Sequence, residues 1–294
     1  MTTDAGVSNL MNDMNLAYYP GCTLDTSAKE INESLHQVCD RFSIHLRELP
    51  DWNCCGSSSV HAVRTQLAVS LAARNLFQAQ ALDSDLMVMC AGCMNRLRVA
   101  EYHLRHSATT IRVNEEILGN RLKKPMRIRH FLDIIPGRLQ EAPWSQSLQK
   151  PLSGLRYVPY YGCLLAKPPE LRHYPKLNGS MESVMKWLGA EELVWNYHAK
   201  CCGAFLSVAR PVIVNPMVSD IMERAISSGA ECIVTACAMC QLNLELRADL
   251  EKRLPVFSTV ELLAYGLGSE DWPKWFNRHM IDPMPLFESK GFCH

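Results

Sequence analysis

The sequence lacks any excess of charge of one sign. Its 294 residues include 30 basic and 30 acidic side chains, so the formal net charge is +0. A balanced chain has no field that draws it to nucleic acid or to an anionic membrane, and we expect neither as a partner. With 48% hydrophobic and 20% charged residues, the composition is that of an ordinary globular protein.

A secretory signal and a membrane-spanning run are missing as well. The first 17 residues have no basic start and no continuous apolar stretch, and no later segment approaches the ~20 apolar residues that cross a bilayer. We therefore predict a cytoplasmic protein with no direct membrane span. In that reducing compartment, clustered cysteines are typical of metal or redox chemistry rather than of structural disulfides.

Nucleotide-binding and ferredoxin motifs are also absent. No G-x-G-x-x-G follows an expected strand, there is no phosphate-binding loop, and the C-x-x-C-x-x-C-x-x-x-C-P run of ordinary ferredoxin clusters does not occur. The chain thus has no evident way to take electrons from a soluble nucleotide, so we expect electrons to pass through a partner.

Cysteine, in contrast, is abundant and ordered. Among 13 cysteines, an adjacent pair followed by glycine occurs twice, each time after a Gly-Cys step and before a Cys-x-x-Cys. The two resulting sets of five are Cys22, Cys54, Cys55, Cys90 and Cys93, and Cys163, Cys201, Cys202, Cys237 and Cys240. The last four members of each set lie 147 positions from their counterparts and the first lies 141 positions away, which indicates an internal duplication.

Short apolar segments precede the cysteines in both halves. LAYYPGC, HLREL and DLMVMC predict strands in the first half, and LRYVPYYGC, LVW and CIVTAC repeat them in the second. Helical patterns cover 26–41 and about 62–82, and we expect a further helix to begin at Asn215-Pro216. The pattern predicts an α/β fold of two pseudo-symmetric Rossmann-like repeats. The cysteines would lie at strand ends or helix starts, where ligands collect in open α/β sheets.

The repeat also predicts the domain organisation. We expect a loosely packed lead-in at 1–14, a first domain at 15–148 and a second at 149–268, joined by the Pro-containing polar segment 140–154. The tail, 269–294, has several prolines and aromatics, and we expect it to be irregular and either to wrap the body or to dock a partner.

Five thiolates in a set need explanation, because four satisfy a zinc ion or an ordinary iron–sulfur cluster. Either one member of each double cysteine is buried and inert, or all five are ligands; the recurrence of the pair favours the second interpretation. Glycines beside the cysteines allow close backbone approach to a cluster or serve only as turn residues. Cys39 and Cys232 lie outside the sets and are predicted to be small buried hydrophobes, and Cys293 has no assignment.

The spacing of each set, together with the segments YYPGC, SLAARNLFQAQ, CAGCMNRL and YYGCLLAKPPE, resembles the CCG-domain proteins, and most closely the B subunit of heterodisulfide reductase. The resemblance implies two non-cubane [4Fe-4S] clusters, each held by the five cysteines of one repeat, at which a disulfide is reduced or formed. It also implies a ferredoxin-like C subunit and a flavin-containing A subunit as partners. Similar subunits occur in bacterial sulfur oxidation, where the substrate would be a thiol, a disulfide or protein-bound sulfur.

Two other functions stay open. One is an electron-relay CCG subunit of a quinone- or flavin-linked dehydrogenase with no disulfide substrate, and the other is a zinc-stabilised assembly subunit. If a thiol substrate is bound, cationic or proton-donating side chains close to the cysteines are candidates for holding it. These candidates are His61, His198, Lys167 and Arg210.

Overall fold

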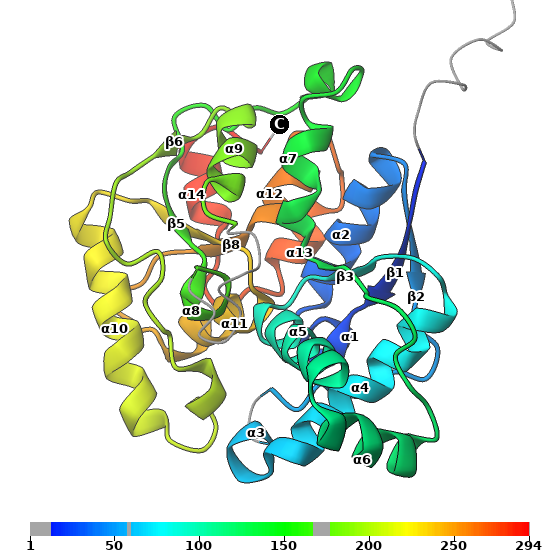
Figure 1. Ribbon diagram of the computed structural model, residues 1–294. Helices are drawn as coiled ribbons and strands as arrows, with labels where there is room; N and C mark the ends of the chain where they lie inside the picture. The colour runs from blue at the N-terminus through cyan, green and yellow to red at the C-terminus, as the bar shows by residue number, and fades with distance from the viewer. Residues whose placement is uncertain (1–12, 58–59, 167–176, 294) are drawn as a thin grey trace, which may run out of the picture.

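The computed structural model describes residues 13–57, 60–166 and 177–293, and within them the chain forms two four-stranded sheets (Figure 1). The strands of the first sheet are β1 (Met14–Tyr19), β2 (Ile44–Glu48), β3 (Leu86–Val88) and β4 (Ile128–Arg129). Those of the second sheet are β5 (Arg156–Tyr160), β6 (Glu191–Glu192), β7 (Cys232–Thr235) and β8 (Val256–Ser258).

The two sheets have the same topology. Their strand orders are β2-β1-β3-β4 and β6-β5-β7-β8, and every neighbouring pair is parallel. The central strands β3 and β7 are buried throughout, as parallel strands covered on both faces must be. The predicted α/β fold of two pseudo-symmetric repeats is thereby confirmed.

Helices connect and cover the strands (Figure 1). In the first half they are α1 (Gly21–Thr26), α2 (Lys29–Arg41), α3 (Val60–Val63), α4 (Thr65–Ala81), α5 (Ala91–His106), α6 (Ala108–Leu118) and α7 (Ile135–Arg138). In the second half they are α8 (Gly162–Ala166), α9 (Ser180–Trp187), α10 (Pro211–Ser227), α11 (Ala238–Arg247) and α12 (Thr259–Gly266). Within the described ranges there are also three short 3-10 turns, at Phe131–Asp133, Trp144–Gln146 and Ala204–Leu206. The face of α2 formed by Ile31, Leu35 and Val38 is buried, as the helical spacing of these residues predicts.

Two predicted helix boundaries are wrong. The helix expected at 62–82 is divided, because Arg64 takes an extended conformation between α3 and α4. The helix expected to begin at Asn215-Pro216 begins at Pro211, so Pro216 lies inside α10. Pro216 is the sixth residue of α10, past the N-terminal N–H groups that have no partner, so the helix forgoes one internal hydrogen bond at this position.

The tail is ordered helix rather than the irregular segment expected. It forms α13 (Trp272–Phe276) and α14 (Met284–Ser289), and the side chains of Trp275, Phe276 and Phe287 are buried. α13 contacts both α2 of the first half and α12 of the second (Figure 1). The tail therefore wraps the body and joins the halves. Of the expected lead-in, residues 1–12 lie outside the described residues and Met14 already belongs to β1.

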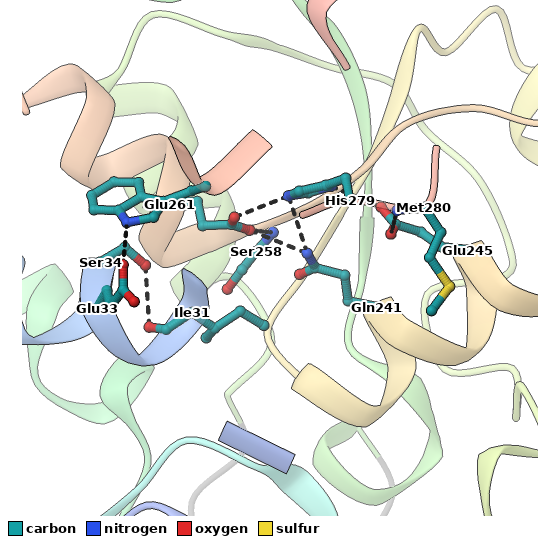
Figure 2. Close-up of polar contacts among 10 residues, drawn as sticks. Ile31, Glu33, Ser34, Gln241, Glu245, Ser258, Glu261, His279 and Met280 are labelled. Carbon is teal, nitrogen blue, oxygen red and sulfur yellow. Dashed lines mark hydrogen bonds and ion pairs between the residues drawn. The ribbon is translucent and has the colours of Figure 1, made fainter. Parts of the chain in front are cut away.

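A buried polar cluster fixes the tail to the second half (Figure 2). The His279 ring lies between two carboxylates, with Nδ1 2.8 Å from Glu245 on α11 and Nε2 3.0 Å from Glu261 on α12. The Met280 backbone N–H also donates to Glu245, at 2.9 Å. The two carboxylates raise the pKa of His279 to about 11 against the effect of burial, so the ring is an imidazolium at neutral pH.

None of the helices within the described ranges is long and apolar enough to cross a membrane.

Candidate functional site

The starts of four helices meet between the two sheets. α1, α5, α8 and α11 each begin beside a cysteine of the two sets, and α5 contacts both α8 and α11 near the centre of the molecule (Figure 1). Cys90 and Cys237 are the residues immediately before α5 and α11. The partial positive charge at helix N-termini favours thiolates and other anions. The predicted placement at helix starts is observed for Cys22, Cys90, Cys93, Cys163, Cys237 and Cys240. The four residues of the two double cysteines lie instead in loops.

In the first set, four thiols form two close pairs. Cys22 Sγ lies 3.7 Å from Cys54 Sγ, and the Cys55 thiol lies 3.2 Å from Cys93 Sγ. Cys22 and Cys54 are exposed, whereas Cys55 and Cys93 are buried. Hydrogen bonds from the Cys22 and Cys55 thiols lower the pKa of Cys54 to about 2. The set therefore offers a thiolate at its solvent edge.

The second set has the same arrangement. Cys202 and Cys240 have their sulfurs 3.7 Å apart, and the backbone N–H of Gly203 donates to Cys201 Sγ at 3.4 Å. A hydrogen bond from the Cys163 thiol lowers the pKa of Cys201 to about 6. Each double cysteine thus has one half-exposed or exposed member and one buried member.

The two sets meet at Cys90 and Cys237, both of which are buried. Hydrogen bonds from the Cys240 thiol and then from the Cys90 thiol hold the pKa of Cys237 well below its usual value. The contact joins residues at equivalent positions of the two repeats. The two sets of five therefore adjoin each other at their Cys-x-x-Cys motifs.

Glycine is required next to each set. Gly21 and Gly162 both have φ of +70°, and a Cβ added to them would lie 3.0 Å from Cys93 Sγ and 3.1 Å from Cys240 Sγ respectively. Such a contact forces the sulfur to move, and the positive φ is itself costly for any other residue. Each Gly-Cys step therefore brings the backbone against the last cysteine of its own set.

A tyrosine from the first strand of each repeat holds the segment that leads into the double cysteine. The Tyr19 hydroxyl donates to the Asn53 carbonyl at 2.9 Å, and the Tyr160 hydroxyl donates to the Lys200 carbonyl at 2.6 Å. Both rings are buried. The YYPGC and YYGC segments therefore position the Cys-Cys-Gly loops as well as their own cysteine.

A small cavity of about 60 Å³ adjoins the second set. Its lining is largely apolar and includes Leu164, Phe205 and Met239 beside Cys163, and Gly92 from the first half. Met239 is the counterpart of Gly92 at the 147-residue offset. The two repeats therefore differ at the cavity: the second repeat contributes the large side chain of Met239, and the first repeat contributes Gly92.

The structure describes the four predicted substrate-side residues to different extents. Lys167 lies outside the described residues, and for His61 the structure gives only its backbone, in α3. His198 is half-buried, and its carbonyl accepts hydrogen bonds from the backbone N–H groups of Tyr161 and Gly162. Arg210 is exposed and precedes α10. Their role in holding substrate stays a prediction.

Sequence reasoning missed the counterpart of Arg210. Arg64 is also exposed and stands before α4, as Arg210 does before α10. The Arg64 N–H donates to the Val60 carbonyl and the Arg210 N–H to the Leu206 carbonyl, both at 2.8 Å. The offset here is 146 rather than 147, so one residue has been gained or lost after the double cysteine. A search for arginines at nearly equal offsets would have found the pair.

The three other cysteines are not part of the group. Cys39 and Cys232 are fully buried, as predicted, and burial raises the pKa of both thiols. Cys293 is exposed in the tail.

The donor set fits a soft metal group. Within the part of the chain that the structure describes, no three His, Cys, Asp or Glu side chains are arranged to hold a single metal ion. The fit therefore rests on ten thiols from two equivalent sets, on the helix N-termini beside them and on the glycines that bring the backbone close. Thiolates select zinc, copper(I) and iron–sulfur clusters, and backbone N–H groups such as that of Gly203 stabilise cluster and ligand sulfur.

The chain belongs to the CCG family. The family model, described as a cysteine-rich domain, matches residues 16–98 and 157–245, and these two ranges contain all ten cysteines of the two sets. The predicted family of two CCG repeats is confirmed.

Several relatives match nearly the whole chain. The 8-methylmenaquinol:fumarate reductase membrane anchor subunit of Wolinella succinogenes is 27% identical, over 92% of this chain and 98% of the relative. The B subunit of the ferredoxin/F(420)H(2)-dependent CoB-CoM heterodisulfide reductase of Methanosarcina acetivorans is 23% identical, over 86% of this chain and 89% of the relative. These matches confirm the predicted resemblance to the B subunit of heterodisulfide reductase.

A solved structure shares the fold. A hypothetical protein from Helicobacter pylori superposes with a TM-score of 0.70 at 11% identity, over 90% of this chain. The chain spans about half of that structure, since it covers 51% of it.

Proposed function

We propose that the chain is an iron–sulfur subunit of a heterodisulfide reductase-like complex, which reduces or forms a disulfide. Each set of five cysteines would hold one [4Fe-4S] cluster of the non-cubane type, within the predicted domains 15–148 and 149–268. The observation that carries the proposal is the closeness of the two Cys-x-x-Cys motifs: the carbonyl oxygens of Met89 and Ala236, the residues just before Cys90 and Cys237, lie 2.9 Å and 3.0 Å from the same nitrogen of His130. This closeness places two complete sets of thiols side by side. Two adjacent one-electron centres suit the two-electron cleavage of a disulfide.

The chain's own residues prepare the site for anionic sulfur. The Gly203 N–H donates to Cys201 Sγ, and neighbouring thiols lower the pKa of Cys54 and of Cys201. Gly21 and Gly162 leave room that a side chain would fill. When bound, the clusters would supply one-electron transfer and iron that binds substrate sulfur.

The cavity beside the second set supports entry of substrate there. Leu164, Phe205 and Met239 line it, so the part of the substrate nearest the thiols would be apolar. Arg210 and its counterpart Arg64 are exposed, and we propose that they attract an anionic group of the substrate at the outer rim. His198 would support the site through its backbone, which holds the Gly162-Cys163 step.

The partners and location follow from the same proposal. We propose that a ferredoxin-like C subunit and a flavin-containing A subunit exchange electrons with the chain, in the cytoplasm. In a bacterial sulfur-oxidising complex the flow would be oxidative, and the substrate would be a thiol or protein-bound sulfur.

An electron relay without a disulfide substrate is the second candidate. A specific observation favours it: the fumarate reductase relative is matched at 27% identity over 98% of its length, more completely than the heterodisulfide reductase relative from Methanosarcina acetivorans. In that case the ten cysteines would hold the same clusters, and a quinone- or flavin-linked dehydrogenase would be the partner.

The decisive experiment is thiol binding to the anaerobically prepared protein. Iron analysis is expected to return about eight iron per chain, the content of two [4Fe-4S] clusters. A thiol substrate added to the oxidised protein is expected to change its electron paramagnetic resonance spectrum, and the S-methylated form of the same compound serves as control. A silent spectrum across a panel of thiols, with electron transfer to a partner intact, would favour the relay; zinc in place of iron would reject both functions.

A further inference from the structure

His130 lies between the two Cys-x-x-Cys motifs. Its side chain is fully buried just after β4, and Nε2 lies 2.9 Å from the Met89 carbonyl oxygen and 3.0 Å from the Ala236 carbonyl oxygen. Met89 and Ala236 are the residues before Cys90 and Cys237, and they are equivalent in the two repeats. A single ring nitrogen therefore lies between matching carbonyls of the two halves.

The protonation of the ring follows from its partners. Nδ1 accepts a hydrogen bond from the Leu132 backbone N–H at 3.1 Å, so this nitrogen carries no proton. Nε2 faces two acceptors and must therefore carry one. Burial lowers the pKa of His130, in keeping with a neutral ring. The Nε2–H is shared by the Met89 and Ala236 carbonyls.

Helix capping alone does not explain a histidine here. His130 and Asp133 form a capping box at the end of β4, and Ser258 with Glu261 forms the same box at the end of β8. Serine is a preferred capping residue and histidine is not. What the imidazole adds is a second nitrogen that reaches the carbonyl of Ala236, 106 positions away in the other half.

We infer that His130 is a positioning residue that fixes the separation of the two Cys-x-x-Cys motifs, and with it the separation of the two metal groups. The statement about the metal groups rests on the proposed two-cluster function. The statement about the two motifs rests only on the geometry of the chain. Without the Nε2–H, two buried carbonyls would face each other with no donor between them, and the ends of β3 and β7 would move apart. The contact of Cys90 with Cys237 would then loosen.

Three substitutions separate the capping role from the positioning role. His130→Asn keeps an acceptor for the Leu132 N–H but has no atom at the place of Nε2, and His130→Ser copies the residue of the second half. His130→Gln puts an amide N–H₂ close to the place of Nε2. A purely structural role as a cap predicts that asparagine is tolerated better than glutamine, and the positioning role predicts the reverse.

The first readout uses the metal-free chain, so it is independent of the proposed function. Diamide accepts two electrons and two protons as two thiols form a disulfide, and peptide mapping measures the yield of the Cys90–Cys237 bond. We expect His130→Gln to match the unaltered protein, and His130→Asn and His130→Ser to give about fivefold less, the effect of one lost hydrogen bond. A yield of the Cys90–Cys237 disulfide equal to that of the wild-type protein, in either His130→Asn or His130→Ser, would overturn the inference.

The second readout is the magnetic interaction between the two reduced clusters, measured by pulsed electron paramagnetic resonance. It should persist in His130→Gln and weaken in His130→Asn, while both keep the wild-type iron content. If His130→Asn and His130→Ser do not fold, His130→Gln still tests the inference. A folded His130→Gln protein that has neither the wild-type disulfide yield nor the magnetic interaction would contradict it. Failure of the wild-type chain to bind iron would instead reject the proposed function. The diamide experiment would still test the position of His130, because it uses the metal-free chain.

Discussion

Glu245 on α11 occupies the position that Arg98 has on α5, since the same 147 residues separate them as separate the Cys-x-x-Cys motifs. Arg98 is paired with Asp133, at 3.6 Å, whereas Glu245 faces Glu261, the counterpart of Asp133 in the second capping box. The reversed charge leaves two carboxylates together in the second repeat. His279 from the tail lies between them and supplies the missing cation (Figure 2).

Replacing His279 with glutamine should therefore destabilise the protein strongly. Removing one member of a buried ionic group leaves uncompensated charge, and we expect a loss of about 3 kcal/mol or more in the free energy of unfolding. Urea unfolding of the metal-free chain at pH 7 measures it. The control is Arg278→Gln, which breaks a more exposed ion pair with Glu33 and should cost about 1 kcal/mol or less. Equal effects of the two substitutions would show that the tail is not held by His279.

A buried carboxyl beside this cluster should make the stability depend on pH. Burial, and then the charge of Glu261, raises the pKa of Glu30 on α2 to about 7 from an ordinary value of 4.5. Between these values the folded state holds more protons than the unfolded state, so the contribution of Glu30 to stability falls as pH rises from 4.5 to 7 and is constant above. Glu30→Gln removes this loss.

We expect Glu30→Gln to gain roughly 2 kcal/mol of stability relative to the unaltered chain when the pH is raised from 5 to 8. The difference between the two proteins is measured at each pH by urea unfolding, so groups common to both cancel. His279, whose raised pKa makes its own contribution disappear between pH 6.5 and about 11, is one such group. A difference that does not change with pH would mean that Glu30 titrates normally.

The fold and the cysteines could be predicted from the sequence because both rest on local, periodic information. Apolar segments that end in cysteine recur at a fixed offset, so LAYYPGC and CIVTAC alone indicate where strands end and where thiols gather. The confirmed strand orders and family match agree with that interpretation.

The contacts between the halves could not be predicted, because they depend on residues for which the repeat breaks. After β4 the offset becomes 128, as His130 and Ser258 show, so no counterpart at 147 marks His130. The tail looked irregular because prolines interrupt it, but Pro273 lies in the first turn of α13, where proline is compatible with helix. Burial of its aromatics against α2 and α12 then supplies the stabilisation that the local sequence does not.

The glycine before the first cysteine of each set should be essential for metal loading at that set. Alanine at Gly21 would place a Cβ 3.0 Å from Cys93 Sγ, and we expect iron to fall from about eight to about four per chain. Gly154→Ala is a matched control, because Gly154 also has a positive φ, +84°, but has nothing within 4 Å of the added Cβ. Both substitutions should cost about 1–2 kcal/mol of stability from backbone strain. Equal iron content in the two variants would contradict the close approach to Cys93.

Substituting the more exposed member of each double cysteine tests whether the fifth cysteine of a set is a ligand. Cys54 is exposed, and hydrogen bonds from Cys22 and Cys55 favour its thiolate, so it is poised as a ligand rather than as a buried hydrophobe. Cys54→Ser should remove the first cluster and leave about four iron per chain. Cys39→Ala should keep all the iron, because that thiol is buried in α2 away from both sets.

The same substitution in the second repeat, Cys201→Ser, should remove the other half of the iron, and the double variant should bind none. Iron and acid-labile sulfide are assayed after anaerobic reconstitution, and the surviving cluster is identified by its paramagnetic signal. If Cys54→Ser and Cys201→Ser both keep about eight iron, four thiolates suffice in each repeat and the exposed cysteine is free. That result would move the exposed thiol from the ligand set to the substrate side, where a free thiolate at the solvent edge would attack a disulfide directly.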